Sequence, residues 1–488
     1  MMRTDLIAFA EERIAQLPLE ALKHAGIQLD RVEDNPEAAR YFLAYGDWGK
    51  VSSSDIFEHM DPGTGQSTQI YMDFPYCPKV CNFCAFYGTL AKSASDQDRY
   101  IQNMKREIDL MSETYFARNP DFRAETVELG GGTPTFFTLE QLQDVLGHLF
   151  KRFPFGAPKQ HSFEATPDTI VGDMGYRKLE LLKSLGFVRM SIGAQSFDEH
   201  VLKHGNRPHE AHQIEEGLKN VRALGFERIN FDLMLGLADQ TVESFLDSVQ
   251  RSMELGIEII EIYTMRFFDT KKHVGVAPLV GWQSRFMTEH EILVGRLSAD
   301  QMLREAGYRS SNGRTYHNDS NDFYADYYAE NFKGSNVLGL GRKSHSNVYP
   351  WQYANYRNVE KYNTHLEAGR LPIAAGCHFE PQARVAKLLT GALQLPQPLD
   401  FQEITNHISR EAAAPFVQVL SLLVEQGLLE RNGQQYTKTF LGFIFIEEML
   451  KLVFDASVKP FNSQVPFLGK DQKPLKLLAL RKKATIDA

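Results

Sequence analysis

The sequence predicts an α/β fold built on a partial (β/α)6 barrel, with an N-terminal extension before the barrel and an α+β domain after it. Two observations carry this prediction. Segments rich in β-branched and aromatic residues alternate with amphipathic segments along the middle of the chain, as expected of repeated βα units. The amphipathic segments also end alike, in a glycine where a left-handed C-cap would turn the chain. These glycines are Gly186, Gly225, Gly256 and Gly307.

Six segments are predicted to be parallel strands, each separated from the next by a helical pattern. In chain order, they span residues 67–74, 126–132, 161–167, 188–195, 228–237 and 258–265. About six repeats favour a curved, partly closed barrel over a full eightfold barrel. The carboxyl ends of the strands then meet at one edge, and the chemistry of such folds belongs there.

The chain divides into four predicted parts. Residues 1–66 form an N-terminal extension expected to cap the active site, and residues 67–310 form the barrel. Residues 311–375 complete the barrel and line the substrate site. Residues 376–488 form a C-terminal domain with a turn at Asn432-Gly433 between two short strands, followed by a basic tail.

Composition limits the function classes. A chain of 488 residues with 43% hydrophobic side chains can bury a large core. A net charge of −9 and a pI near 6.0 argue against a broad basic surface for nucleic acid. Long apolar runs and a secretory leader are absent, so we expect a cytoplasmic protein without a nucleic-acid or membrane partner. In that reducing compartment, clustered cysteines are metal ligands or catalytic groups rather than disulfides.

The motif "CPKVCNFC" places Cys77, Cys81 and Cys84 on the loop directly after the first predicted strand. The fourth cysteine, Cys377, stands alone and is expected to be a small apolar core residue. Three thiolates on one compact loop can hold a [4Fe-4S] cluster and leave one iron open for a ligand that is not a protein group. Zinc bound by three sulfurs and water is the competing interpretation, although structural zinc needs a fourth ligand and none is adjacent.

Polar groups follow the later strands. Gly130, Gly131 and Gly132 end the second predicted strand, where the absence of Cβ would let backbone amides approach a charged ligand; a tight turn is the alternative. Four polar side chains lie at or beyond the ends of the next strands, and burying such a charged set is costly unless a ligand or the groups themselves compensate. They are Glu164, Gln195, Arg207 and Asp232.

The segment "YMDFPYCPKVCNFC" resembles the cluster loop of the radical S-adenosylmethionine (SAM) superfamily. The later segments "GGGTPT", "FEATPD", "SIGAQSFDE", "GNRPH" and "NFDLMLGL" resemble, in order, the oxygen-independent coproporphyrinogen III oxidase subfamily and its heme-chaperone relatives. The resemblance is strong from Thr68 to Met265. It implies an oxygen-sensitive [4Fe-4S] enzyme that cleaves SAM to a 5′-deoxyadenosyl radical, with an electron donor such as flavodoxin or ferredoxin.

The resemblance also implies two SAM molecules in the barrel. Tyr71, Gly131 and Glu164 match positions at the cluster-bound SAM. A second set matches positions around the other molecule, namely Phe83, Gly132, Thr133, Gln195, Arg207 and Asp232. Arg266 stands where the oxidases have a small residue near that second ligand, so the second pocket should differ in shape.

Further candidates lie beyond these sets. Tyr263 and Met265, on the last predicted strand, are expected to face the cavity, with a core role as the alternative. His345 in "LGLGRKSHS" matches a histidine of the family and is a candidate substrate-site residue.

Two departures from the family reduce the range of reactions that the resemblance implies. The coproporphyrinogen oxidases carry another Cys two residues after the third, where this chain has Phe86. The heme chaperones carry a His-Asn-x-x-Tyr-Trp motif, and the corresponding segment here, 327–332, reads "YYAENF" without a histidine. His317 is nearby in sequence and could substitute for the missing heme-ligating histidine, but an exposed loop residue is the favoured interpretation.

The resemblance therefore favours a class-C-like methyltransferase or cyclopropanase, in which a second SAM supplies a methyl or methylene carbon to an sp2 carbon of a small-molecule substrate. Coproporphyrinogen decarboxylation and heme carriage stay open as alternatives. The C-terminal domain resembles the winged-helix-like domain of the subfamily, and its acidic residues favour a lid over the substrate rather than a DNA-binding module.

Overall fold

The computed structural model describes the chain with several gaps. The described residues are 3–27, 29, 32–33, 48–60, 68–84, 89–91, 93–121, 123–156, 160–226, 228–268, 285–318, 336–378, 380–406 and 408–457. The segment 327–332, Phe86 and the basic tail lie outside these ranges.

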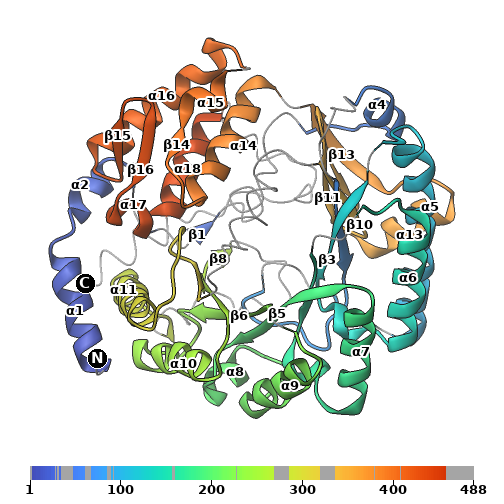
Figure 1. The fold of residues 1–488 in the computed structure, drawn as a ribbon, viewed down its shortest axis with the longest axis horizontal. Coiled ribbons are helices and arrows are strands. Elements are labelled where there is room, and N and C mark those ends of the chain that lie inside the picture. The colour runs from blue at the N-terminus through green and yellow to red at the C-terminus, as the bar shows by residue number, and fades with distance from the viewer. Residues whose placement is uncertain are drawn as a thin grey trace.

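One 11-stranded sheet organises the fold and curves around the centre of the molecule (Figure 1). In sheet order, its strands are β13 (Ile373–His378), β12 (Trp351–Asn355), β11 (His345–Val348), β10 (Asn336–Leu340), β2 (Thr68–Phe74), β3 (Ala124–Gly131), β4 (His161–Ala165), β5 (Phe187–Gln195), β6 (Arg228–Leu235), β7 (Ile259–Thr264) and β9 (Thr315–His317).

The run from β2 to β7 is parallel throughout, which confirms the partial (β/α)6 barrel. The strand β10 adds a further parallel neighbour to β2, from a segment that the sequence assigned only to barrel completion. The strands β11, β12, β13 and β9 are antiparallel and extend the sheet at its two ends. A separate two-stranded pair joins β1 (Val32–Glu33) to β8 (Phe267–Phe268).

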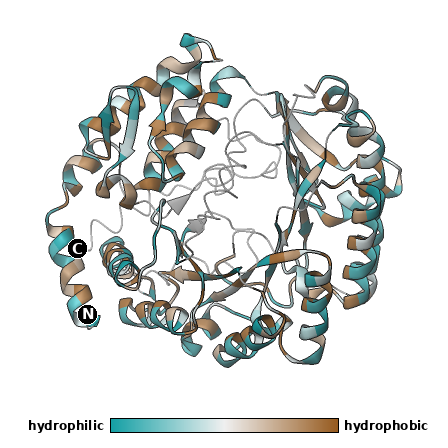
Figure 2. Ribbon diagram, viewed as in Figure 1, coloured by the Kyte–Doolittle hydropathy of each residue, from teal (hydrophilic) through white to brown (hydrophobic). Residues whose placement is uncertain are grey.

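Helices cover the outer face of the curved sheet, and their apolar sides turn toward it (Figure 2). They are α5 (Ala94–Met111), α6 (Leu139–Arg152), α7 (Gly172–Ser184), α8 (Glu199–His204), α9 (Ala211–Ala223), α10 (Val242–Glu254), α11 (Glu289–Glu305) and α13 (Val359–Glu367). The π-helical turn η1 (Ser112–Phe116) continues α5, and two loops contain the 3-10 helices η2 (Pro134–Phe136) and η3 (Pro167–Thr169). The predicted C-cap glycines are confirmed, because Gly186, Gly225, Gly256 and Gly307 all have φ between +66° and +88°.

The C-terminal domain completes the ring of elements in Figure 1. It contains α14 (Pro381–Gln394), α15 (Phe401–Thr405), α16 (Arg410–Glu425), α17 (Phe440–Ile444) and α18 (Ile446–Ser457). A three-stranded antiparallel sheet completes it, with β14 (Leu399–Asp400), β16 (Gln435–Lys438) and β15 (Leu429–Asn432) in that order. The predicted hairpin turn is present, since Gly433 has φ +63° between β15 and β16.

The N-terminal extension contains α1 (Arg3–Ala15), α2 (Leu19–His24) and α4 (Ser53–Glu58). The helix α1 lies outside the barrel against α11, where Ser298 Oγ donates to the Leu6 carbonyl at 3.2 Å. A later part of the extension contacts a residue of the cavity wall, because the Trp48 ring centroid lies 6.4 Å from that of His345.

Cys377 is buried in β13, which confirms its expected core role. None of the helices described here is both long and apolar enough to cross a bilayer.

Candidate active site

The cysteine loop leaves the carboxyl end of β2 and folds back on itself. Cys77 N donates to the Thr89 carbonyl at 3.0 Å, and Thr89 N donates to the Pro75 carbonyl at 2.9 Å. Cys84 N donates to the Cys81 carbonyl at 3.2 Å. These bonds close a compact loop that keeps the three thiols at one end of the barrel.

The three sulfurs are close enough to influence each other. Burial raises the pKa of the Cys77 thiol to about 12, a hydrogen bond from Thr133 opposes this rise, and Cys84 and Cys81 add to it. None of the four cysteines forms a disulfide, and all four lie within the described ranges. A thiol with such a raised pKa needs a bound cation to become a thiolate, as a metal centre provides.

This donor set fits a [4Fe-4S] cluster. Three thiols from one loop would ligate three irons and leave one iron open to a ligand from the cavity. His345 is the only histidine among the cavity-lining residues that the structure describes. The loop therefore lacks the adjacent fourth ligand that a structural zinc site requires.

The carboxyl ends of the parallel strands surround a cavity of about 540 Å³. That volume lies within the ~300–1,000 Å³ typical of small-molecule sites. Its walls include the three predicted cluster ligands, both predicted SAM sets, and Tyr263, Arg266 and His345. The residues are Cys77, Cys81, Cys84, Tyr71, Phe83, Gly131, Gly132, Thr133, Glu164, Gln195, Arg207, Asp232, Tyr263, Arg266 and His345. The structure thus brings the two predicted SAM sets into one space.

A wall of carboxylates runs across the strands. The sheet register places Tyr71 beside Glu128 and Asp232 beside Glu261, with Glu164 on β4 between these pairs. Burial raises the pKa of Glu164 to about 8, with further increases from Glu128, Asp232 and Asp73. Mutual repulsion of this kind is relieved when a cation binds among the carboxylates.

Asp232 has the second strongly shifted carboxyl group of this wall. Burial and then the neighbouring Glu261 raise its pKa to about 7. Ser191 Oγ donates to Asp232 Oδ2 at 2.8 Å, and Asn230 Nδ2 donates to Oδ1 at 2.6 Å. These two bonds favour the ionised form and fix the carboxyl group in the cavity.

Glu261 and Asp73 have partners of opposite charge. Arg314 Nε lies 3.0 Å from a Glu261 carboxylate oxygen, and Arg342 Nε lies 3.4 Å from Asp73 Oδ2. Burial still raises the pKa of Asp73 to about 6, although Arg342 opposes the rise. The two arginines therefore offset only part of the negative charge of these carboxylates.

The glycine run packs the end of β3 against the cysteine loop. Gly132 N donates to the Phe74 carbonyl at 2.7 Å, and Thr133 N donates to the Tyr76 carbonyl at 3.1 Å. Gly131 has φ +103°, and a Cβ there would collide with the Asp73 carboxylate. The amides of Gly132 and Thr133 thus bind backbone, and the predicted ligand contacts of Gly131, Gly132 and Thr133 stay predictions.

Gln195 ends β5 in a backbone conformation that residues other than glycine rarely adopt. Its φ is +66°, and its Nε2 folds back to within 2.9 Å of where a Cβ on Gly193 would stand. Non-glycine residues with positive φ are often found at functional sites, where the surrounding structure maintains them.

Arg207, predicted beside the second SAM, lies against the cysteine loop. Its Nη1 donates to Cys81 Sγ at 3.2 Å, and its Nη2 donates to the Gly193 carbonyl at 2.5 Å. Its place at the second SAM stays a prediction.

Arg266 and Tyr263 connect the barrel to its surroundings. Arg266 forms an ion pair with Glu447 of α18, so the guanidinium ties the barrel to the C-terminal domain. Tyr263 lines the cavity, and the Arg314 guanidinium lies 5.5 Å from its ring centroid.

Two residues depart from the first expectation of the sequence. Met265 is not among the cavity-lining residues and packs in a small apolar cluster with Val201 and Leu237, so the alternative core role is the one found. His317 is buried in β9 and exchanges two backbone hydrogen bonds with Arg309, so it is not an exposed loop residue.

Sequence reasoning missed part of the cavity wall. Glu128 and Glu261 each stand between two apolar residues of a strand, and that contrast was a usable signal. Lys387 and Gln394 also line the cavity, but they come from α14 of the C-terminal domain. No local pattern indicates that this helix faces the strand ends.

Comparison with known families identifies the chemistry. Residues 71–251 match the Radical SAM superfamily. This chain contains a radical SAM domain. The cofactors of this radical SAM enzyme are a [4Fe-4S] cluster and SAM, in agreement with the three-thiol loop at the cavity.

Curated relatives cover most of this radical SAM enzyme. An oxygen-independent coproporphyrinogen III oxidase of Helicobacter pylori is 26% identical over 422 residues, 83% of this chain and 89% of the relative. The corresponding protein of Escherichia coli is 29% identical over 408 residues, 80% and 86% of the two chains. The heme chaperone HemW of Bacillus subtilis is 24% identical over 398 residues, 78% and 97% of the two chains.

The fold of the radical SAM enzyme also matches a solved structure. Coproporphyrinogen III oxidase (HemN) from Escherichia coli has a TM-score of 0.72 at 20% identity. The match covers 87% of this chain and 99% of that chain. At this identity, the similarity establishes the fold.

Proposed function

We propose that this radical SAM enzyme transfers a SAM-derived carbon to an sp2 carbon of an organic small molecule, as in class-C methylation or cyclopropanation. The observation that carries the proposal is the single cavity of about 540 Å³ that the two predicted SAM sets share. Its partly compensated carboxylates suit two cationic sulfonium ligands, because each ligand adds positive charge beside Glu164 or Asp232.

The proposed roles follow the positions of the side chains. Cys77, Cys81 and Cys84 hold the cluster, which when bound supplies the electron that cleaves SAM to methionine and the 5′-deoxyadenosyl radical. Glu164 lies beside Tyr71 above Gly130 and accepts hydrogen bonds from the first SAM.

The second SAM is the proposed carbon donor. Asp232, held by its two neutral donors, faces its positive charge, and Gln195 lies at the adjacent strand end. The expected products are 5′-deoxyadenosine and, when a methyl group is transferred, S-adenosylhomocysteine. The protein orients the two molecules and excludes water from the radical.

Phe86 supports carbon transfer over decarboxylation. The resembled oxidases have a cysteine at that place, and Phe cannot supply its thiol. The ion pair between Arg266 and Glu447 turns the guanidinium toward α18, so the larger residue at this position does not have to fill a second SAM site.

Oxidative decarboxylation of coproporphyrinogen III is the second candidate, because relatives that bear the oxidase name align over 80% or more of this chain. Heme carriage is a third, since the HemW relative aligns over 78%. The segment that corresponds to the chaperone motif has no histidine, which weighs against it.

Anaerobic assays separate the three candidate functions. To test carbon transfer, reconstituted protein is incubated with methyl-deuterated SAM, a reductant such as reduced flavodoxin or ferredoxin, and cell extract. The products are then analysed by mass spectrometry. A labelled product with S-adenosylhomocysteine supports carbon transfer. Release of carbon dioxide from added coproporphyrinogen III supports decarboxylation, whereas stoichiometric heme binding without turnover supports a carrier. Label confined to unreacted SAM refutes the proposal, and Cys81→Ala is the inactive control.

A further inference from the structure

The cysteine loop is held from its outer side by the segment that follows α8. Asn82 donates twice to this segment, from its backbone N to the Gly205 carbonyl at 3.0 Å and from Nδ2 to the His204 carbonyl at 2.7 Å. In return, Asn206 Nδ2 donates to the Val80 carbonyl at 2.8 Å. The residues on both sides of the middle cysteine are therefore fixed to one short segment.

Arg207, the next residue of that segment, reaches the middle cysteine itself. Its Nη1 lies 3.2 Å from Cys81 Sγ, while its Nη2 donates to the Gly193 carbonyl on β5 at 2.5 Å. Arg207 is only 9% exposed, and its hydrogen bond to the Gly193 carbonyl orients the guanidinium toward Cys81. A guanidinium is positively charged and its N–H donors form a rigid fork. Arg207 therefore places a charged hydrogen-bond donor beside the Cys81 sulfur.

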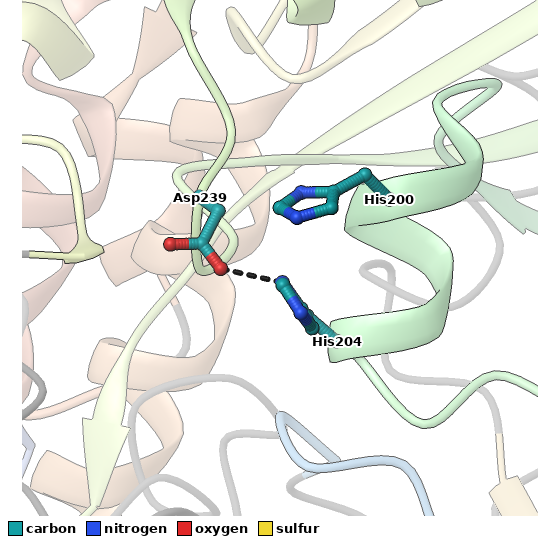
Figure 3. A group of neighbouring side chains, drawn as sticks. All are labelled: His200, His204 and Asp239. Atoms are coloured by element: carbon teal, nitrogen blue, oxygen red, sulfur yellow. Dashed lines mark ion pairs between the residues drawn. The ribbon is translucent and has the colours of Figure 1, made fainter.

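A cluster of polar side chains, His200, His204 and Asp239, lies beside the end of α8, where this segment begins. In Figure 3, His200 and His204 on successive turns of α8 face Asp239, and His204 Nδ1 lies 2.5 Å from Asp239 Oδ2. The Arg285 guanidinium already pairs with Asp239, through Nε to Oδ1 at 2.7 Å and through Nη2 to Oδ2. Because a cation already neutralises this carboxylate, the cluster anchors the end of α8 and is not assigned to a metal ion.

We propose that Arg207 is an outer-sphere residue of the [4Fe-4S] cluster, whose hydrogen bond to the Cys81 sulfur makes the cluster easier to reduce. An added electron increases the negative charge on the ligating sulfurs, and a charged donor stabilises that charge. Hydrogen bonds to sulfur are a known means by which proteins raise cluster potentials. The inference depends only on the radical SAM assignment, so it holds whichever reaction follows.

The segment 204–207 then has two separable effects. The bonds of Asn82 and Asn206 restrain the loop backbone, whereas Arg207 acts on the sulfur. Loss of a backbone restraint should make the iron easier to remove and leave the potential unchanged. Loss of the guanidinium should lower the potential.

The test is a redox titration of the reconstituted full-length protein without SAM, followed by electron paramagnetic resonance, together with the rate of iron release to a chelator. The variants are Arg207→Gln, Arg207→Lys and Asn206→Gly; glycine tolerates the φ of +53° at residue 206. Arg251→Gln removes a guanidinium that pairs with Glu215 and Glu254 on the surface, and it serves as the matched control.

We expect Arg207→Gln to shift the midpoint potential to more negative values and Arg207→Lys to shift it less, since lysine keeps the charge but cannot bridge Gly193 and Cys81. Asn206→Gly should release iron faster at an unchanged potential, and Arg251→Gln should match the wild type. A wild-type potential in Arg207→Gln overturns the proposal. If Arg207→Gln assembles no cluster, a wild-type potential in Arg207→Lys overturns it instead.

Discussion

Replacing Glu164 by Gln should remove a proton-linked step from SAM binding. In the ligand-free protein, burial and neighbouring carboxylates raise the pKa of Glu164 to about 8. A cation that binds beside this group needs the carboxylate, so binding expels its proton. The affinity of the wild type should therefore increase as the pH rises through 8.

The magnitude follows from that shift. At pH 7, one unit below the pKa, about a tenth of the groups are ionised, and ionising the rest costs ~1.4 kcal/mol. At pH 9, about nine tenths are already ionised. This group alone should therefore tighten SAM binding roughly tenfold between pH 7 and pH 9, a factor that Glu164→Gln lacks.

Equilibrium dialysis with radiolabelled SAM measures this factor in anaerobic, unreduced protein, where SAM is not cleaved. Titration of SAM itself affects both proteins equally, so the informative quantity is the difference between their pH 9 to pH 7 affinity ratios. Glu180→Gln, on the exposed face of α7, is the control and should behave as the wild type. Equal ratios in the wild type and Glu164→Gln would refute the reasoning.

The same shift has a signature in stability. A carboxyl group whose pKa is higher in the folded protein than in the unfolded chain stabilises the fold at low pH, and this stabilisation is lost as the pH rises through the folded-state value. Ligand-free Glu164→Gln should therefore gain thermal stability relative to the wild type between pH 6 and pH 9.

Three further substitutions test the scaffold of the site. Glu447→Gln removes the charged partner of Arg266 and should lower the free energy of unfolding, measured with denaturant, by ~1–3 kcal/mol. The loss should be smaller than for a fully buried ion pair, because the Glu447 side chain is 25% exposed. Gly131→Ala forces an L residue to φ +103° and should cost at least ~1–3 kcal/mol and lower the iron content after reconstitution; unchanged iron would contradict this. Tyr362→Phe removes a 2.6 Å hydrogen bond to buried Glu107 and should lower the unfolding free energy by ~1–3 kcal/mol; no change in the denaturant midpoint would disprove that role.

The strands of the barrel were predictable because each has a local signature. A strand such as 187–195 is recognised from its own residues, and the C-cap glycine before it is recognised from its place at the end of a helical pattern. Both the strand and the glycine conformation are found as expected. The strand β10 was not predicted as a parallel neighbour of β2. Residues 68 and 336 pair across a large sequence separation, and local patterning does not encode which strands become neighbours.

The candidate site shows the same division. The position of Cys77 to Cys84 after β2 required only a strand and the rule that function lies at the carboxyl ends of parallel strands. Lys387 was missed because its helix belongs to another domain, and only the tertiary fold brings it to the cavity.

Arg207 explains why the set of site residues was predictable but their individual contacts were not. Sequence reasoning placed it in the cavity, and it lies there. Its contact with Cys81, however, joins residues 126 positions apart and depends on where α8 ends and on the left-handed Asn206 that follows. Roles at such a site are therefore decided by the geometry of its supporting segments, and the redox titration of Arg207 variants tests that geometry directly.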